Sequence, residues 1–194
     1  RRACGLLAPR AVARPGALRA AATESRFITD DASCNVTPYI AALVGRDLHK
    51  RENHPLNTIK RKIETYFAGL GEAYEVFDGE DPVVTTTQCF DDLNIPPEHP
   101  GRSPSDTYYV TADHVLRTHT SAHQSEHLRG GHERFLCTGD VYRRDEIDAS
   151  HFPAFHQMEG VKLFDPALVG GAMSREEWLA SDECQLVAAD LKKT

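Results

Sequence analysis

Apolar residues recur at steps of three and four between residues 54 and 70, the pattern of an amphipathic helix. The apolar positions are Leu56, Ile59, Ile63, Phe67 and Leu70. Pro55 suits the first helical position, where its missing N–H would have no partner within the helix. Gly69 and Gly71 are typical helix-ending residues. We therefore expect a helix that begins at His54-Pro55 and packs its apolar face on another element.

Alternation of apolar and polar residues predicts strands at several later points in the chain. These are Tyr74–Phe77, Val83–Phe90, Thr107–Val110, Phe135–Arg144 and Ala154–Phe164. Asp78-Gly79 indicates a turn between the first two. Four prolines within Asn94–Ser105 predict an extended loop that takes no part in a sheet.

Further helices are expected on both sides of these strands. A short helix is expected near Pro38–Leu48, and Glu176–Leu191 is helical in pattern. Ser121 and Gln124 have the spacing of a capping box, and Gly130-Gly131 would end the helix that follows. Strands joined by hairpins and loops, with helices at either end, predict an α+β fold around an antiparallel sheet.

The last two predicted strands carry charge among apolar residues. Alternation places Gln157 and Glu159 on one face with Phe155, and places Arg143 on the face that includes Val141. Buried charges require partners. One interpretation is a structural ion pair between Arg143 and Glu159. The other is a binding site in which Arg143 grips a phosphate while Gln157 and Glu159 accept hydrogen bonds from an ammonium group.

Composition adds an unusual leader to this picture. Residues 1–23 contain eight alanines and five arginines and no acidic residue, which is typical of an organelle transit peptide; a disordered basic tail is the alternative. The formal net charge is −7, and without those five arginines it is −12, which argues against a general nucleic-acid-binding surface. The five cysteines are scattered without a C-x-x-C pair, and no apolar run reaches the ~20 residues of a membrane span.

Several motifs together resemble a known family. Residues 142–145 (YRRD), 148–153 (DASHFP) and 155–160 (FHQMEG) resemble motif 2 of the class II aminoacyl-tRNA synthetases. Residues 116–124 (LRTHTSAHQ) and 90–96 (FDDLNIP) are similar to phenylalanyl-tRNA synthetases, and the leader favours the single-chain organellar form. The helix that begins at His54 resembles motif 1. The resemblance runs from about Asn35 to Phe164.

The resemblance implies a role for individual residues. Arg143 would be catalytic, holding the α-phosphate of ATP and the substrate carboxylate, and the motif 2 loop would cover ATP with Ser150, His151 and Phe152. The residues that would bind phenylalanine are His119, Ser121, Ala122, His123, Gln124, Gln157, Met158 and Glu159. The resemblance implies no metal ligand within these 194 residues.

The resemblance also implies an organisation and an activity. Residues 24–53 would be an N-terminal extension, and residues 54–194 a partial catalytic domain with motifs 1 and 2. Motif 3, the magnesium ligands and an anticodon-binding domain are expected beyond Thr194, so the 194 residues alone are expected to be inactive. The full protein would use ATP to join phenylalanine to tRNA(Phe) in the mitochondrial matrix or a plastid. It would be a monomer or a homodimer, and it would not bind a membrane. A non-catalytic, synthetase-like binding protein is the alternative.

One competing motif indicates different chemistry. Residues 123–127 (HQSEH) match the H-x-x-E-H pattern of inverted zinc proteases, which places His123 and His127 on one helix face. The helix is short and no acidic third ligand is evident, so a solvated histidine stripe is the simpler interpretation.

Overall fold

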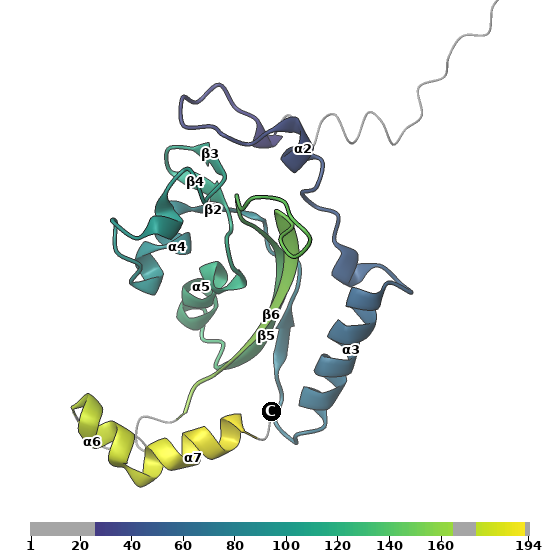
Figure 1. Ribbon diagram of the computed structural model, residues 1–194. Coiled ribbons are helices and arrows are strands. Elements are labelled where there is room, and N and C mark those ends of the chain that lie inside the picture. Colours follow the sequence, from purple (N-terminus) through teal and green to yellow (C-terminus); the bar gives the residue numbers. More distant parts are fainter. Residues whose placement is uncertain (1–25, 165–173, 193–194) are drawn as a thin grey trace, which may run out of the picture.

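A computed structural model describes residues 26–164 and 174–192 of the chain. The predicted leader at residues 1–23 lies outside these ranges. Figure 1 shows a long curved ribbon of two strands, with one helix along one side and shorter helices on the other. The helices are α2 (Pro38–Ala41), α3 (Pro55–Ala68), α4 (Thr86–Cys89), α5 (Gln124–Arg129), α6 (Arg175–Ala180) and α7 (Asp182–Leu191). The 3₁₀ turns are η1 (Leu48–Lys50), η2 (Asp91–Leu93), η3 (Pro100–Arg102) and η4 (Thr120–His123).

Two three-stranded sheets form the framework. The first has the order β1 (Glu75–Phe77), β5 (Arg134–Tyr142), β6 (Ala154–Lys162), and the second has the order β2 (Val83–Thr85), β4 (His114–Leu116), β3 (Tyr109–Thr111). The predicted α+β class is confirmed. The pairing of β1 with β5 is parallel, whereas β5 pairs with β6 antiparallel along its whole length.

The two faces of the β5–β6 ribbon meet different helices. Gly160 on one face is turned toward the Phe67 ring of α3, because a Cβ at Gly160 would lie about 4 Å from two carbon atoms of that ring. On the opposite face the thiol of Cys137 lies 3.9 Å from the carbonyl oxygen of Thr120 in η4. Because side chains alternate along a strand, odd-numbered residues of both strands face η4 and even-numbered residues face α3. In Figure 1, α3 and α5 accordingly lie on opposite sides of the ribbon.

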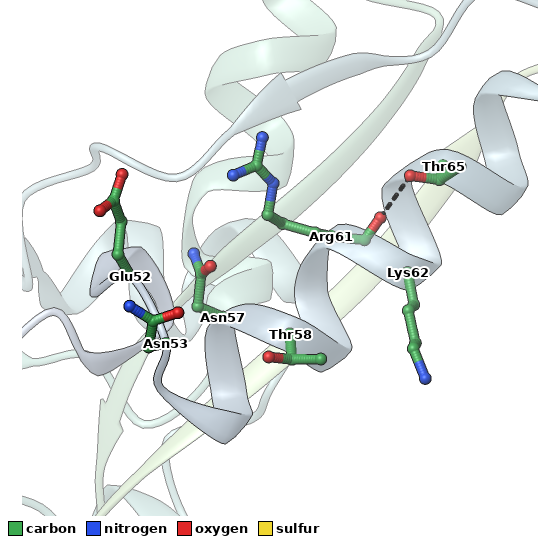
Figure 2. Close-up of a pocket in the computed structure, with 7 residues that line it drawn as sticks. All are labelled: Glu52, Asn53, Asn57, Thr58, Arg61, Lys62 and Thr65. Atoms are coloured by element: carbon green, nitrogen blue, oxygen red, sulfur yellow. Dashed lines mark hydrogen bonds between the residues drawn. The ribbon is translucent and has the colours of Figure 1, made fainter.

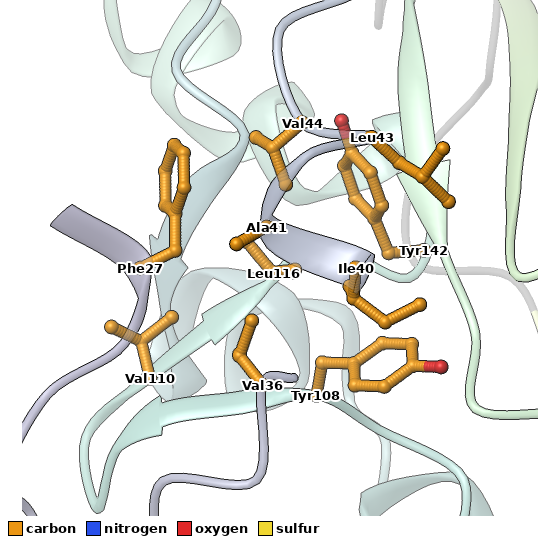
Figure 3. Close-up of a cluster of buried hydrophobic side chains, with 10 residues drawn as sticks. All are labelled: Phe27, Val36, Ile40, Ala41, Leu43, Val44, Tyr108, Val110, Leu116 and Tyr142. Carbon is orange, nitrogen blue, oxygen red and sulfur yellow. The ribbon is translucent and has the colours of Figure 1, made fainter. Parts of the chain in front are cut away.

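The main hydrophobic cluster joins the N-terminal segment to both sheets. Figure 3 shows its ten buried side chains: Phe27, Val36, Ile40, Ala41, Leu43, Val44, Tyr108, Val110, Leu116 and Tyr142. Tyr142 and Leu116 are fully buried. Six of the ten belong to the stretch predicted as an N-terminal extension, which therefore packs into the core of the domain.

Helix α3 forms where the apolar period and Pro55 predict it. The His54 ring nitrogen accepts from the Leu56 N–H, and Gly69 lies at the C-terminal end. Its apolar face is only partly covered, since Ile59 is 55% exposed. Lys60 is buried instead, with its ammonium group paired to Glu64 and, at 2.8 Å, to Asp78. The lysine stem packs while its charge is neutralised, which the apolar pattern alone does not reveal.

Two predicted strands require correction. The strand expected at Val83–Phe90 ends at Thr85, because the Thr85 and Gln88 side chains form a capping box that starts α4. The strand expected at Thr107–Val110 is β3, shifted to Tyr109–Thr111 and paired with the unpredicted strand β4.

The helical segment near the C-terminal end is two helices rather than one. Ser181 has extended φ and ψ angles, and its side chain accepts from the Cys184 N–H, so α7 starts anew there. At the other end of the chain, the short helix expected near Pro38–Leu48 spans only Pro38–Ala41.

Candidate active site

Two buried hydrogen-bond acceptors without donors mark the face of β6 that is turned toward η4. Glu159 Oε2 accepts from the Ser121 hydroxyl at 2.7 Å, while Glu159 Oε1 is buried without a hydrogen-bond partner. Gln157 Oε1, two residues away on the same face, is also buried and unpartnered. Unpaired buried acceptors are costly, so this face is suited to a ligand that brings N–H donors.

The Ser121 contact corrects the predicted capping box. Helix α5 begins at Gln124 with His123 as its N-cap, and no side chain caps it. The Ser121 hydroxyl is directed at Glu159 instead, because η4 turns Ser121 toward the sheet. Ser121 therefore holds a carboxylate of the site in place.

The segment from Thr118 to Ser121 crosses the sheet face and connects the two ends of the site. The Thr118 carbonyl accepts from Arg143 Nε at 3.1 Å, and Ser121 binds Glu159 at the other end. Three residues of extended chain span at most ~11 Å between α-carbons. The Arg143 and Glu159 side chains therefore approach the same short segment from opposite ends.

Arg143 does not form the structural ion pair with Glu159, so that interpretation is wrong. The register sets Glu159 opposite Cys137, and the Arg143 N–H bonds to the carbonyl of Pro153, six residues further along the ribbon. Six residues of strand correspond to ~20 Å between backbones. Within the described residues, no ion pair involves either side chain.

The Arg143 guanidinium is half-buried and held in place by two contacts. Its Nε donates to Thr118, and its central carbon lies 5.1 Å from the centre of the Phe155 ring. Both contacts orient the planar group, which can then present its terminal N–H donors to an anion.

His119 lies between the two ends and is held neutral. Burial, followed by the positive charge of Arg143, lowers its pKa. Both ring nitrogens are buried without hydrogen-bond partners. A neutral imidazole can donate through one nitrogen and accept through the other, so His119 can contact a polar ligand.

The loop between β5 and β6 carries the three residues expected to cover ATP. One oxygen of Asp148 accepts from the backbone N–H groups of Ser150 and His151, at 2.7 and 2.8 Å, and the other lies 2.8 Å from the His151 ring. These contacts lower the pKa of Asp148 and raise the pKa of His151. Phe152 is 46% exposed. The loop is thus a solvent-facing turn organised by Asp148.

Three residues expected to bind phenylalanine lie away from this face. Ala122 is buried in a second apolar cluster with Val84 and Phe90. His123 is buried beside Arg117, and Met158 faces α3 with the even-numbered residues. Gln124 is partly buried at the start of α5.

The zinc-protease interpretation is not supported by the geometry of its histidines. His123 Nε2 lies 2.9 Å from an Arg117 guanidinium nitrogen, where it accepts a hydrogen bond. Burial and the Arg117 charge lower the pKa of His123 to about 4. His127 lies instead 3.4 Å from a carboxylate oxygen of Glu80. Each histidine is engaged in a separate contact.

Arg117 has a structural role that the sequence analysis did not identify. It is 3% exposed, its Nε donates to the Asp140 carbonyl at 2.7 Å, and its own carbonyl accepts from the Tyr142 N–H. Its guanidinium lies directly over Gly139, where any Cβ would overlap it. Arg117 therefore joins the second sheet to β5. The sequence signal was Gly139 inside a strand pattern, which indicates a close approach by another group without naming that group.

A hollow on the outer surface of α3 has no part in this site. It has a volume of about 510 Å³ and contains none of the predicted site residues. Figure 2 shows its lining of polar side chains, among them Asn57, Arg61 and Lys62.

Comparison with known proteins identifies the class. The chain belongs to the class II aminoacyl-tRNA synthetases: residues 38–168 match the family described as the tRNA synthetases class II core domain (F). The chain is 48% identical over 167 residues to "Phenylalanine--tRNA ligase, chloroplastic/mitochondrial" of Arabidopsis thaliana, covering 84% of this chain and 37% of that protein. It is 51% identical over 134 residues to "Phenylalanine--tRNA ligase, mitochondrial" of Dictyostelium discoideum, covering 67% of this chain and 30% of that protein.

A solved structure of pyrrolysyl-tRNA synthetase from Desulfitobacterium hafniense matches with a TM-score of 0.43 and 17% identity, over 54% of this chain and 37% of that one. The chain spans about a third of the length of the curated relatives it matches. None of the helices in residues 26–164 and 174–192 is long and apolar enough to cross a bilayer.

Proposed function

We propose that this chain supplies the amino-acid-binding part of a phenylalanine–tRNA ligase, which activates phenylalanine with ATP and transfers it to tRNA(Phe). The observation that carries the proposal is the pair of buried acceptors, Gln157 Oε1 and Glu159 Oε1, which have no donor partners. A substrate ammonium has three N–H donors and a positive charge, so it suits a carboxylate beside an amide oxygen.

The opposite end of the site suits the anionic groups of the reaction. Adenylate formation brings a carboxylate and a triphosphate together and requires no protein nucleophile. Catalysis then depends on positioning and on charge stabilisation. Arg143 is our candidate to contact both anions, and its orientation by Thr118 and Phe155 supports this assignment. A permanently charged, planar guanidinium suits that role better than an ammonium group does.

Magnesium normally accompanies ATP in such a reaction, and the described residues do not provide a site for it beside Arg143. Among them, the group of three residues suited to hold a metal ion lies on the α3 face of the sheet. We also propose an organellar location, because the matched relatives are named for mitochondria and chloroplasts and residues 1–23 have the composition of a transit peptide.

The direct test is phenylalanine-dependent pyrophosphate–ATP exchange by the complete polypeptide that contains this chain. We expect exchange with phenylalanine and little with alanine or leucine. Absence of exchange with every amino acid would reject the proposal and favour a non-catalytic binding protein.

The role of Arg143 can be tested with a conservative substitution. Arg143→Lys keeps the positive charge but loses the planar two-pronged contact, so adenylate formation should fall by ~100- to 1000-fold, as for loss of a charge-stabilising donor. Arg144→Lys is the matched control, because the neighbouring Arg144 is exposed and donates to the Pro104 carbonyl. Thermal unfolding of both variants should be unchanged. Near-normal activity of a folded Arg143→Lys protein would reject the assignment.

A further inference from the structure

A cluster of two histidines and one aspartate lies on the face of the sheet opposite the candidate active site. Asp140 and His156 are direct cross-strand partners in β5 and β6, and His49 comes from η1. One oxygen, Asp140 Oδ1, lies 3.3 Å from His49 Nδ1 and 2.9 Å from His156 Nε2. His49 is 2% and Asp140 5% exposed, and the His156 side chain is 14% exposed.

The His49 ring lies between two acceptors, which a neutral imidazole cannot satisfy. Its Nδ1 faces the Asp140 carboxylate, and its Nε2 faces the carbonyl oxygen of Asp78 at 3.4 Å. A neutral imidazole carries one N–H, so one of these nitrogens would turn its lone pair toward an oxygen. Both separations exceed the usual 2.7–3.2 Å of a hydrogen bond. An electrophile between His49 Nδ1 and Asp140 Oδ1 removes the conflict.

The spacing and chemistry of the three groups suit a transition metal. Their ligand atoms all lie within 4.8 Å of one another. Zinc bonds of ~2.0 Å in a tetrahedron place neighbouring ligand atoms roughly 3.3 Å apart, close to the two observed His–Asp separations. The Asp78 carbonyl faces the other ring nitrogen of His49, which is where backbone carbonyls orient metal-bound histidines. We propose that His49, Asp140 and His156 bind a single divalent transition-metal ion of the zinc class.

Cavities reach the cluster from two sides and give an ion a route. One, of about 190 Å³, is lined by His49 and His156, and another, of about 260 Å³, is lined by Asp140 and Tyr142. The second cavity is also lined by three basic side chains and three further acidic ones, so its charges balance and do not repel a cation. These are Arg26, Lys50 and Arg117, and Asp47, Glu80 and Asp81.

Such an ion would tie the N-terminal segment to the central ribbon. His49 lies in η1, shortly before α3, while His156 adjoins Gln157 of the candidate active site. Metal binding to a site absent from the unfolded chain adds directly to folding stability. The ion would be structural, because the cluster lies on the face turned away from the substrate groups.

The test is titration of the complete, chelator-treated polypeptide with Zn²⁺ by calorimetry, and with Co²⁺ by visible absorption. Excess Mg²⁺ is included to occupy oxygen-only sites. We expect one Zn²⁺ per chain with micromolar or tighter affinity and an intense visible Co²⁺ band, which indicates fewer than six ligands. Zinc at 100 times its Kd should raise Tm by a few degrees. Loss of a residue that only hydrogen-bonds a metal ligand weakens metal binding by up to ~100-fold. His156 would be a ligand itself, so His156→Gln should weaken zinc binding by at least ~100-fold.

A matched control separates the cluster from other histidines. His132 lies 2.7 Å from Glu75, a similar histidine–carboxylate contact outside the cluster, so His132→Gln should bind zinc normally. Asp140→Asn tests the shared ligand. If that variant fails to fold, the Co²⁺ spectrum of the unaltered protein and the His156→Gln titration still decide. No saturable zinc binding, or equal binding by His156→Gln and His132→Gln, would overturn the proposal and leave a proton-linked ion cluster.

Discussion

Substitution of Gly139 by alanine provides a demanding test of how the two sheets are joined. A Cβ at Gly139 would overlap the Arg117 guanidinium, whose central carbon would lie only 2.7 Å away. Arg117 is buried and cannot retreat without losing its bonds to the Asp140 carbonyl and His123. Overpacking costs ~1–3 kcal/mol, and a weakened hydrogen bond to a charged group costs ~1.5–3 kcal/mol. We expect a loss of about 3 kcal/mol or more.

The assay is thermal and urea unfolding of the chain. At ~2–4 °C per kcal/mol for a protein of this size, Tm should fall by ~6–12 °C. Gly160→Ala is the matched control, because its Cβ would come closest to the end of the Leu136 side chain, at 3.3 Å, and would be in ordinary contact with the Phe67 ring at 3.9 Å. In an Arg117→Ala background, most of the cost of Gly139→Ala should disappear, with a coupling energy of ~0.5–3 kcal/mol. Equal stability of the Gly139→Ala and Gly160→Ala proteins, or strict additivity in the cycle, would refute the reasoning.

Two further predictions concern the site. Ser121→Ala removes the hydroxyl that holds Glu159. Because hydrogen bonds to charged groups contribute ~1.5–3 kcal/mol, KM for phenylalanine in the complete protein should rise by ~10-fold or more. An unchanged KM would show that Ser121 has no role in the site. Asp148→Asn should lower the pKa of His151 toward its ordinary value, measured by NMR titration, because the carboxylate raises it. Since the pKa of His151 is raised and that of Asp148 lowered, their contact stabilises the loop above the ordinary aspartate pKa and below the ordinary histidine pKa. The contact is lost as pH rises through the raised His151 pKa or falls through the lowered Asp148 pKa. We expect the loop of the Asp148→Asn variant to lack this pH dependence. An unchanged His151 titration in that variant would contradict this account.

Local pattern was sufficient for the long elements. The three- and four-residue period fixes α3, and Pro55 sets its start, because both act within the segment itself. The alternation in Arg134–Tyr142 and Ala154–Lys162 determines which residues share a face, so the sequence alone places Gln157 and Glu159 on one face. The short elements were less predictable. Thr85 and Gln88 form a local capping box that redirects an apparently continuous strand into α4.

Register and long-range contacts decided what the pattern left open. Alternation allowed Arg143 to pair with Glu159, but the backbone pairing sets them six residues apart and turns each toward the Thr118–Ser121 segment. Ser121 has the spacing of a helix cap, yet its hydroxyl finds a carboxylate 38 positions away in sequence.

The sequence by itself determined the class of the protein, its long helix and its central strand pair, because these depend on periodicity and on motifs that are contiguous along the chain. Only the tertiary structure decided how Arg117 crosses Gly139, and how His49 meets Asp140 and His156. Those contacts join residues far apart in sequence through close packing. Hydrophobic periodicity does not indicate which distant side chains will contact one another in the core, because the contacts depend on how the elements pack.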